Sequence, residues 1–316
     1  MLDARARDWT SEETRAAQVR RFAGLERAVQ WRYLALLLPA VAFLAFFYGY
    51  PVAAMLLRSF NDPTWSLEHF ERLTRISRHQ EYFGVSVPIN AYVRVFGITL
   101  RISLVVTVAT LLLGYPVAYL LASVRPAVAN LLLICVLVPF WTSILVRSYA
   151  WMVLLGREGT INELLTTLGI RNEPVQLLNT RLAVYVGMVH ILLPFMILPL
   201  FSVMRGIDRT YLRAAENLGG SPAQVFWRVF LPLSLPGVGA GCLVVFILAL
   251  GFYITPALVG GPRDVMISML IAQQVTQLNW GFASALALVL LVIALAIYVG
   301  FTKVLGVERL YGGTRT

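Results

Sequence analysis

Six long apolar stretches alternate with polar segments along the chain, at about residues 33–57, 95–122, 129–155, 182–204, 237–260 and 282–305. Each exceeds the roughly 20 apolar residues that a helix needs to cross the hydrocarbon core of a bilayer. The pattern therefore predicts an all-α polytopic membrane protein with six transmembrane helices.

The composition excludes an ordinary soluble protein. Apolar residues make up 59% of the 316 residues and charged residues only 13%, whereas soluble domains average about 45–50% and about 25%. In a soluble chain, the net charge of +10 would suggest nucleic acid. Here we interpret the basic residues as topology signals, because Lys and Arg hold loops on the cytoplasmic side. Both cysteines lie within apolar runs, so we expect packing roles and no disulfide or metal site.

Loop charges predict the orientation. Six crossings put both termini on one side of the membrane, and cytoplasmic termini give fourteen Lys and Arg in cytoplasmic segments against nine in external ones. The expected organisation is a cytoplasmic tail at 1–32, a transmembrane domain at 33–305 and a second cytoplasmic tail at 306–316. The first tail is too long to belong to a cleaved signal peptide.

Two of the expected external loops carry local signals. Thr160 and Glu163 match a capping box for a short helix that ends before Gly169. The segment 58–94 contains the turn sequence Asn61-Asp62-Pro63, followed by a short amphipathic stretch, SLEHFERL.

The polar segment 205–236 is the most informative part of the chain. Asp208 is a good N-cap for a helix over about 209–218, and Gly219-Gly220 is a good stop. A second helix begins at Ser221-Pro222, with Gln224 completing a capping box. Its apolar face comprises Val225, Phe226, Val229 and Phe230, and Pro232 and Pro236 are expected to end it at the membrane. The product is a cytoplasmic helix–Gly–helix elbow whose small residues let another protein approach the backbone closely.

This segment resembles the EAA loop in permease subunits of importers driven by ATP-binding cassettes. That pattern reads E-A-A, three residues, G, nine residues and I-x-L-P. The matching positions are Ala214, Ala215, Gly219, Val229, Leu231 and Pro232, with Val in place of Ile. Arg213 stands where the family usually has Glu. A salt bridge formed by that Glu is therefore not expected in this chain.

The resemblance extends from about residue 95 to 290. GYPVAYLLA at 114–122 is a general mark of these permeases. The segments that resemble the spermidine/putrescine permease group are VPFWTSILVRSYAWMVLL at 138–155, LLPFMILPLF at 192–201 and FYITPALVGGP at 252–262. The implied fold is that of a type I importer permease. The implied activity is to form half of a translocation pathway for a small polar amine such as putrescine or spermidine.

The resemblance also implies partners. These are a second related permease subunit, two ATPase subunits on the cytoplasmic side and a periplasmic substrate-binding protein. The chain has no G-x-x-x-x-G-K-[ST] loop, and its only lysine is Lys303, so we expect no ATPase or other enzyme site, no cofactor and no nucleic acid partner. The expected ATPase-coupling residues are Arg213, Ala214, Ala215, Glu216, Asn217, Leu218, Gly219 and Ser221.

Residues of the translocation path are harder to choose. The candidates are Trp141, Arg147, Tyr149, Trp151, Phe252 and Tyr253. Aromatic faces attract cations and so suit amines, but Trp and Tyr also form belts at membrane interfaces. A charge at membrane depth suggests function, yet Arg147 also fits snorkelling to the interface or a contact with a backbone carbonyl. His190 is expected to be a packing residue and Arg101 an interfacial anchor.

Several alternatives stay open. Polyamine permeases often carry carboxylates in the region that matches 252–258, and this chain has none there. A zwitterionic amine, an amino-acid derivative, phosphonate, sulfate or iron would fit the same permease class. A stand-alone secondary carrier would need intramembrane ionisable pairs. A membrane-embedded enzyme would need a clustered catalytic group, and the three histidines are scattered.

Overall fold

The computed structural model describes residue 33 and residues 35–74, 78–82, 85–89 and 91–305. The two tails expected at 1–32 and 306–316 lie outside the described residues. The chain divides into two compact units, one ending at Arg58 and the other beginning at Ser59. The described part of the first unit is one apolar helix of 23 residues, Ala35–Leu57. It includes the π-helical segment η1 (Ala45–Gly49) and α2 (Tyr50–Leu57).

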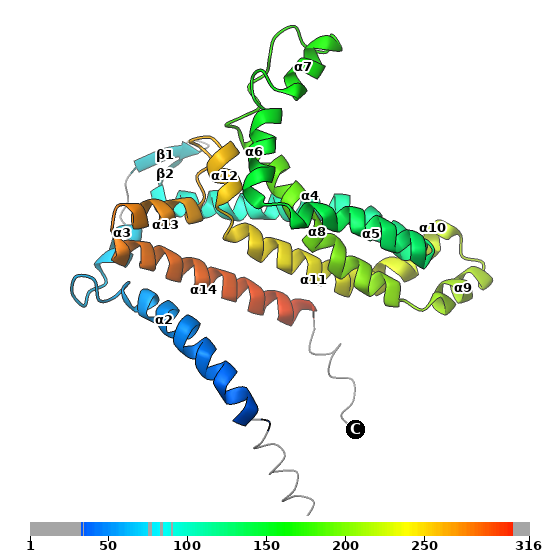
Figure 1. Cartoon of the computed structure of the whole chain (residues 1–316), viewed down its shortest axis with the longest axis horizontal. Coiled ribbons are helices and arrows are strands. Elements are labelled where there is room, and N and C mark those ends of the chain that lie inside the picture. Colours follow the sequence, from blue (N-terminus) through cyan, green and yellow to red (C-terminus); the bar gives the residue numbers. More distant parts are fainter. Residues whose placement is uncertain (1–32, 34, 75–77, 83–84, 90, 306–316) are drawn as a thin grey trace, which may run out of the picture. The chain divides into compact units, whose positions relative to one another are not determined.

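The second unit is a helical bundle. The long helices α4 (Ala91–Ser123), α8 (Arg181–Gly206), α11 (Leu231–Leu250) and α14 (Trp280–Leu305) run side by side (Figure 1). Helix α8 is central because its contacts with α4 and with α11 are the two most extensive between any elements of the described residues. Its Met188, Met196 and Leu200 are fully buried. Small residues let two membrane helices approach closely, and Gly237 of α11 lies against the backbone of α8 at Leu200.

The third apolar stretch is not one continuous helix. It folds as α5 (Pro126–Trp141) and α6 (Ile144–Leu154), which meet at an angle of 90°. Thr142 and Ser143 have extended backbone between them. The Thr142 hydroxyl donates a 2.7 Å hydrogen bond to the Pro139 carbonyl, and such local bonds compete with helix continuation. By length and composition the described residues contain five spanning helices, or six with this bent pair.

The fifth stretch also differs from the expected helix. The short helix α10 (Pro222–Val225), the π-helical segment η2 (Phe226–Phe230) and α11 form one continuous helix of 29 residues, so Pro232 and Pro236 do not end it. Within η2 the Leu231 amide bonds to the Phe226 carbonyl, a wider turn of the kind that occurs singly within α-helices. The helix ends at Leu250, and α12 (Ile254–Val259) is separate.

Shorter elements gather at the end of the bundle where α14 begins. They are α3 (Glu68–Thr74), the hairpin of β1 (Arg78–Tyr82) with β2 (Val85–Ile89), and α13 (Ile267–Thr276). The strands are antiparallel, with Arg78 opposite Ile89, and the sequence pattern did not predict them. Leu73, Ile267, Phe282 and Leu286 form a second buried cluster there.

The short helix α7 (Thr160–Thr167) follows α6, and both project away from the four long helices (Figure 1). It ends before Gly169, as expected, and Gly169 has a φ of +68°. The predicted capping box is wrong, because Gly159 occupies the N-cap position and makes no side-chain cap. Thr160 is instead the first residue of the helix.

Candidate functional site

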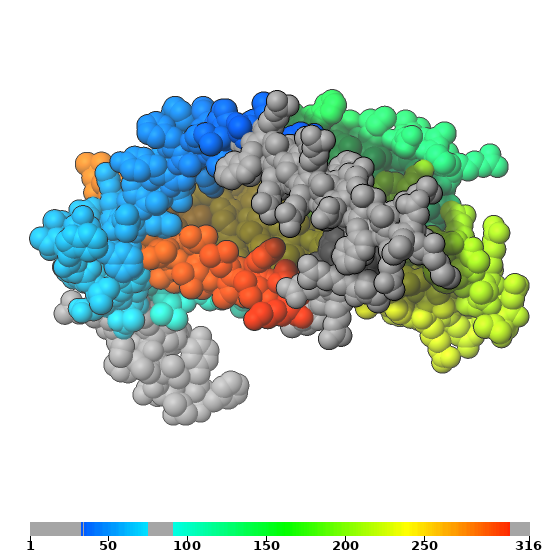
Figure 2. Space-filling view, turned by 90° about the horizontal axis from the view of Figure 1, so that it is seen from below, coloured from blue at the N-terminus to red at the C-terminus, as the bar shows by residue number. Residues whose placement is uncertain are grey.

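The elbow begins with α9 (Arg209–Asn217), which projects with α10 at the opposite end of the bundle from α3 and α13 (Figures 1 and 2). Asp208 is its N-cap, as predicted, and accepts a 2.8 Å hydrogen bond from the Thr210 amide. That bond stabilises the carboxylate and lowers the pKa of Asp208 below its ordinary value. The start of α9 is therefore fixed by a local, charge-assisted contact.

The turn between the two helices depends on its glycines. The Gly219 amide bonds to the Glu216 carbonyl at 2.9 Å, and the Gly220 amide bonds to the Ala215 carbonyl at 3.0 Å. Gly219 has a φ of +84°, a conformation that costs other residues about 1–2 kcal/mol. A side chain on Gly220 would place its Cβ 2.8 Å from the Ala215 carbonyl oxygen. The chain therefore reverses at this point without a longer loop.

The second half of the elbow is held by its cap and by aromatic packing. Ser221 and Gln224 form the predicted capping box, with distances of 2.9 and 3.4 Å. The predicted apolar face also packs inward, since Val225 and Phe230 are buried. The rings of Phe226 and Phe230 lie edge-on to Tyr119 of α4, at centroid distances of 5.6 and 5.0 Å. The elbow is thus joined directly to the bundle.

The elbow has two distinct sides. A groove of about 300 Å³ follows its turn and is lined by residues that include Ala215, Leu218 and Gly219. Leu218 is 89% exposed at this turn. Arg213 and Glu216 instead line a second cavity, between α9 and the ends of α4 and α8.

The eight expected coupling residues therefore lie on one elbow but do not share one surface. Seven of the eight are exposed and Ala215 is half-buried. Arg213 and Glu216 line the cavity next to α4 and α8, whereas Ala215, Leu218 and Gly219 line the groove at the turn.

The six candidates for the translocation path do not form one cluster. Trp151 and Phe252 pack against the main hydrophobic core, whereas Trp141, Tyr149 and Tyr253 are exposed. Two elements that carry them do lie together, because α6 packs on α12 and the Ser148 and Thr255 hydroxyls are 2.9 Å apart.

The ionisable side chains of Arg147 and His190 differ in their hydrogen bonding. The Trp151 indole donates a 3.0 Å hydrogen bond to Nδ1 of His190, which agrees with the packing role expected for His190. In Arg147, Nε and Nη1 are buried and have no hydrogen-bond partner among the described residues. A buried guanidinium is costly without a partner, and within the described part of the chain these two atoms do not make the backbone-carbonyl contact that the sequence also suggested.

Sequence reasoning missed two tertiary contacts that support the elbow. The Arg209 guanidinium donates to the Ala122 and Ser123 carbonyls at the end of α4, at 3.4 and 3.3 Å. The hydroxyls of Tyr115 on α4 and Ser234 on α11 are 2.9 Å apart. Both contacts join residues more than 80 positions apart, so no local pattern signals them.

Comparison with known proteins places the chain in a family. The sequence model of the binding-protein-dependent transport system inner membrane component matches residues 111–305. The spermidine/putrescine transport system permease protein PotB of Haemophilus influenzae is 41% identical over 210 residues, which cover 66% of this chain and 73% of that protein. PotB of Escherichia coli strain K12 is 39% identical over 196 residues, covering 62% and 71%.

The fold has a solved counterpart. A chain in the crystal structure of a bacterial alginate ABC transporter, in complex with an alginate pentasaccharide-bound periplasmic protein, superposes with a TM-score of 0.69. The two are 19% identical, and the match covers 86% of this chain and 93% of that one. The chain belongs to the family of binding-protein-dependent transport system inner membrane components, multi-pass permeases that are not themselves enzymes.

Proposed function

We propose that this chain is one permease subunit of an ATP-driven importer for polyamines such as putrescine and spermidine, in which it forms half of the translocation path. Its partners are a second related permease, two ATPase subunits and a periplasmic substrate-binding protein. The cargo is inferred from the sequence identity of about 40% between this chain and two spermidine/putrescine permeases.

The elbow is the docking site for an ATPase subunit. Its turn is capped on both sides, so it binds without first having to fold, which lowers the entropy cost of association. Its exposed Leu218 and small neighbouring residues suit insertion into an apolar groove of a partner. Closure of the ATPase then moves the elbow, and the continuous helix from Pro222 to Leu250 carries the displacement into the membrane.

A matched pair of leucines tests this docking. Leu218 and Leu168 are both C-cap residues of short helices, both are exposed, and each precedes a glycine with positive φ. We expect Leu218→Ser to reduce co-purification of the ATPase subunits at least tenfold, because it removes an apolar anchor without disturbing the core. Leu168→Ser is expected to leave co-purification unchanged.

A bulkier change tests the coupling itself. In the assembly reconstituted with its partners, Gly219→Trp is expected to abolish substrate-stimulated ATP hydrolysis and uptake. Gly169→Trp has the same kind of backbone strain and should retain the ATPase subunits. Normal uptake and substrate-stimulated ATPase activity in Gly219→Trp would refute the proposed coupling.

The cargo is tested separately. Uptake of labelled spermidine and putrescine, in cells that lack their own polyamine importers and express the full assembly, should depend on this chain. If the assembly hydrolyses ATP but takes up neither polyamine, the chain is still a permease subunit but polyamines are not its cargo. The ligand that co-purifies with the binding protein would then identify the alternative, such as an amino-acid derivative, phosphonate or iron.

A stand-alone secondary carrier is the second candidate. It predicts uptake without any ATPase subunit and requires ionisable pairs within the spans. The two ion pairs found among the described residues are Arg72–Glu68 on α3 and Arg181–Asp264 at the start of α8. Neither lies in the middle of a span, which favours the ATP-driven importer.

A further inference from the structure

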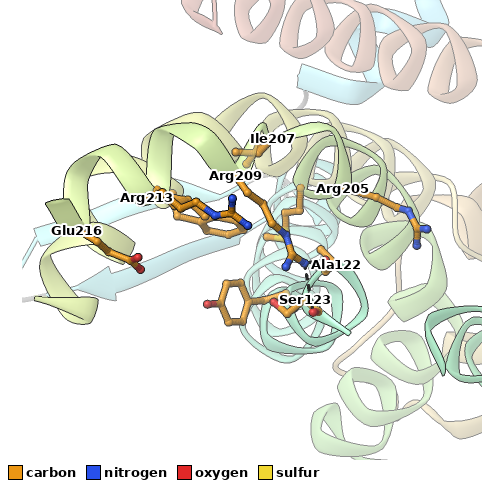
Figure 3. Close-up of a pocket in the computed structure, with 11 residues that line it drawn as sticks. Ala122, Ser123, Arg205, Ile207, Arg209, Arg213 and Glu216 are labelled. Carbon is orange, nitrogen blue, oxygen red and sulfur yellow. Dashed lines mark hydrogen bonds between the residues drawn. The ribbon is translucent and has the colours of Figure 1, made fainter. Parts of the chain in front are cut away.

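A cavity of about 300 Å³ lies on the side of α9 that faces the bundle (Figure 3). Arg209, Leu212, Arg213 and Glu216 line it at the spacing of one helical face. The opposite wall is formed by the end of α4 and the end of α8, including Tyr119 and Met204. This cavity is separate from the groove at the elbow turn, where we propose that the ATPase docks.

The charges around the cavity are unbalanced. Arg205, Arg209 and Arg213 line it together with a single carboxylate, Glu216, so the ionised side chains sum to +2. Arg209 is partly engaged, because it bonds to the carbonyls of Ala122 and Ser123, where the helix end carries partial negative charge. The guanidinium of Arg205 lies over the ring of Phe201, 5.5 Å from its centroid.

Arg213 is the decisive residue. No carboxylate of the described residues lies within ion-pair distance of it, and the carboxylate of Asp208, which acts on it from further away, is bonded to the Thr210 amide. Arg213 also stands where the resembling permeases usually have Glu. With Glu at that position the four charges would sum to zero, so this one residue makes the cavity cationic. Figure 3 shows Arg213 beside Arg209 on the cavity side of α9.

We propose that this cavity binds the phosphate of an anionic phospholipid, held between Arg209 and Arg213. The cavity lies at the ends of α4 and α8. Both helices are long and apolar enough to cross a membrane, and the ends of such helices lie in the headgroup region of a bilayer. Beside the charged groups, Tyr119, Ile207 and Leu212 line the cavity and are exposed or only partly buried, so they offer apolar surface to the glycerol and upper acyl chain that a soluble anion would not use. Basic pockets at the ends of transmembrane helices bind anionic headgroups in this way. The bound lipid would hold α9 against α4 and α8 and so fix the position of the elbow.

The test measures lipid binding by the purified full-length chain in a zwitterionic detergent, using native mass spectrometry. The probes are dioctanoyl phosphatidylglycerol, dioctanoyl phosphatidylcholine and inorganic phosphate. We expect phosphatidylglycerol to bind in preference to the other two, and its binding to weaken as salt is raised. Arg213→Gln should weaken it about fivefold and Arg213→Glu about thirtyfold, since each unit of charge near an anionic headgroup contributes about fivefold.

Arg125→Gln is the matched control, because Arg125 is an exposed arginine that caps α5 at the same end of the bundle and does not line the cavity. It should leave phosphatidylglycerol binding unchanged. Equal binding of phosphatidylcholine or inorganic phosphate would overturn the proposal, as would wild-type affinity in Arg213→Glu. If Arg213→Glu fails to fold, Arg213→Gln provides the test. A fivefold loss of phosphatidylglycerol binding supports the proposal, and unchanged binding overturns it. Because no partner subunit takes part, the result is independent of the proposed transport function.

Discussion

At the scale of single residues, the elbow is specified by a few side chains that each satisfy a backbone group. Asp208 and Ser221 each cap the start of a helix, and Gly219 supplies the positive φ between the two helices. Capping residues stabilise a helix because they satisfy amides that the helix leaves unpaired. These residues lie next to the groups they satisfy, which explains why the caps were predictable from the sequence.

The cap at Asp208 predicts a pH dependence. Its folded-state pKa is lowered, so its stabilisation of α9 is present above the unfolded pKa and is lost as pH falls through the folded pKa. We expect the first-turn amides of α9 to lose protection from hydrogen exchange below about pH 4. Asp208→Asn keeps a neutral cap and should show no such transition. The same pH profile in both proteins would mean that the carboxylate does not stabilise the helix.

At the scale of helices, close packing of α8 against α11 holds the bundle together. A Cβ on Gly237 would lie 2.9 Å from Cβ of Val203 and 3.3 Å from Cα of Leu200. Backbone cannot yield as a flexible side chain does, so the two helices would have to separate.

We therefore expect Gly237→Val to lower the free energy of unfolding by about 1–3 kcal/mol, seen as a lower melting temperature in detergent. Gly97→Val is the control, since a Cβ on Gly97 of α4 would have no neighbouring atom within 4 Å. Equal melting temperatures for the two variants would contradict the close approach of α8 and α11.

The loop after α12 depends on an ion pair. The Arg181 Nε and Asp264 Oδ1 atoms are 2.6 Å apart, and Asp264 is buried. Because Asp264→Asn removes a charged acceptor from a buried bond, it should destabilise the protein by about 1.5–3 kcal/mol. The exposed pair Arg72–Glu68, at 3.7 Å, provides a comparison, and Glu68→Gln is expected to change stability by less than about 1 kcal/mol. Equal losses in the two variants would argue against a special role for burial.

The sequence predicted helix positions better than helix directions. Hydropathy located the apolar stretch from 129 to 155, but it contains no information about the 90° bend between α5 and α6. The same pattern could not show that η2 lets the chain pass Pro232 and Pro236 without a break. Both features depend on local hydrogen bonds rather than on hydrophobicity. The contacts of Arg209 with α4 depend on tertiary structure alone.

At the scale of the whole molecule, the proposed orientation places the elbow in the cytoplasm and the loop after α7 outside. Single cysteines at Leu218 and Arg171, in a chain whose Cys135 and Cys242 are replaced by Ser, test this. We expect a membrane-impermeant maleimide to label Leu218→Cys only in inverted vesicles, and Arg171→Cys only in intact spheroplasts. The reverse labelling pattern would show that the topology is inverted and that the elbow lies outside the cell, where no ATPase subunit could bind it.

The uninterrupted helix from Pro222 to Leu250 has a mechanical consequence. Its 29 residues span about 43 Å at 1.5 Å per residue. If the helix pivots by about 10° about its end next to Ser221, the far end is displaced by roughly 7.5 Å. That far end adjoins Gly251, where the chain leaves the helix and turns toward α12. A small rotation of this helix at one surface of the membrane therefore displaces its other end by a distance similar to the size of a small solute.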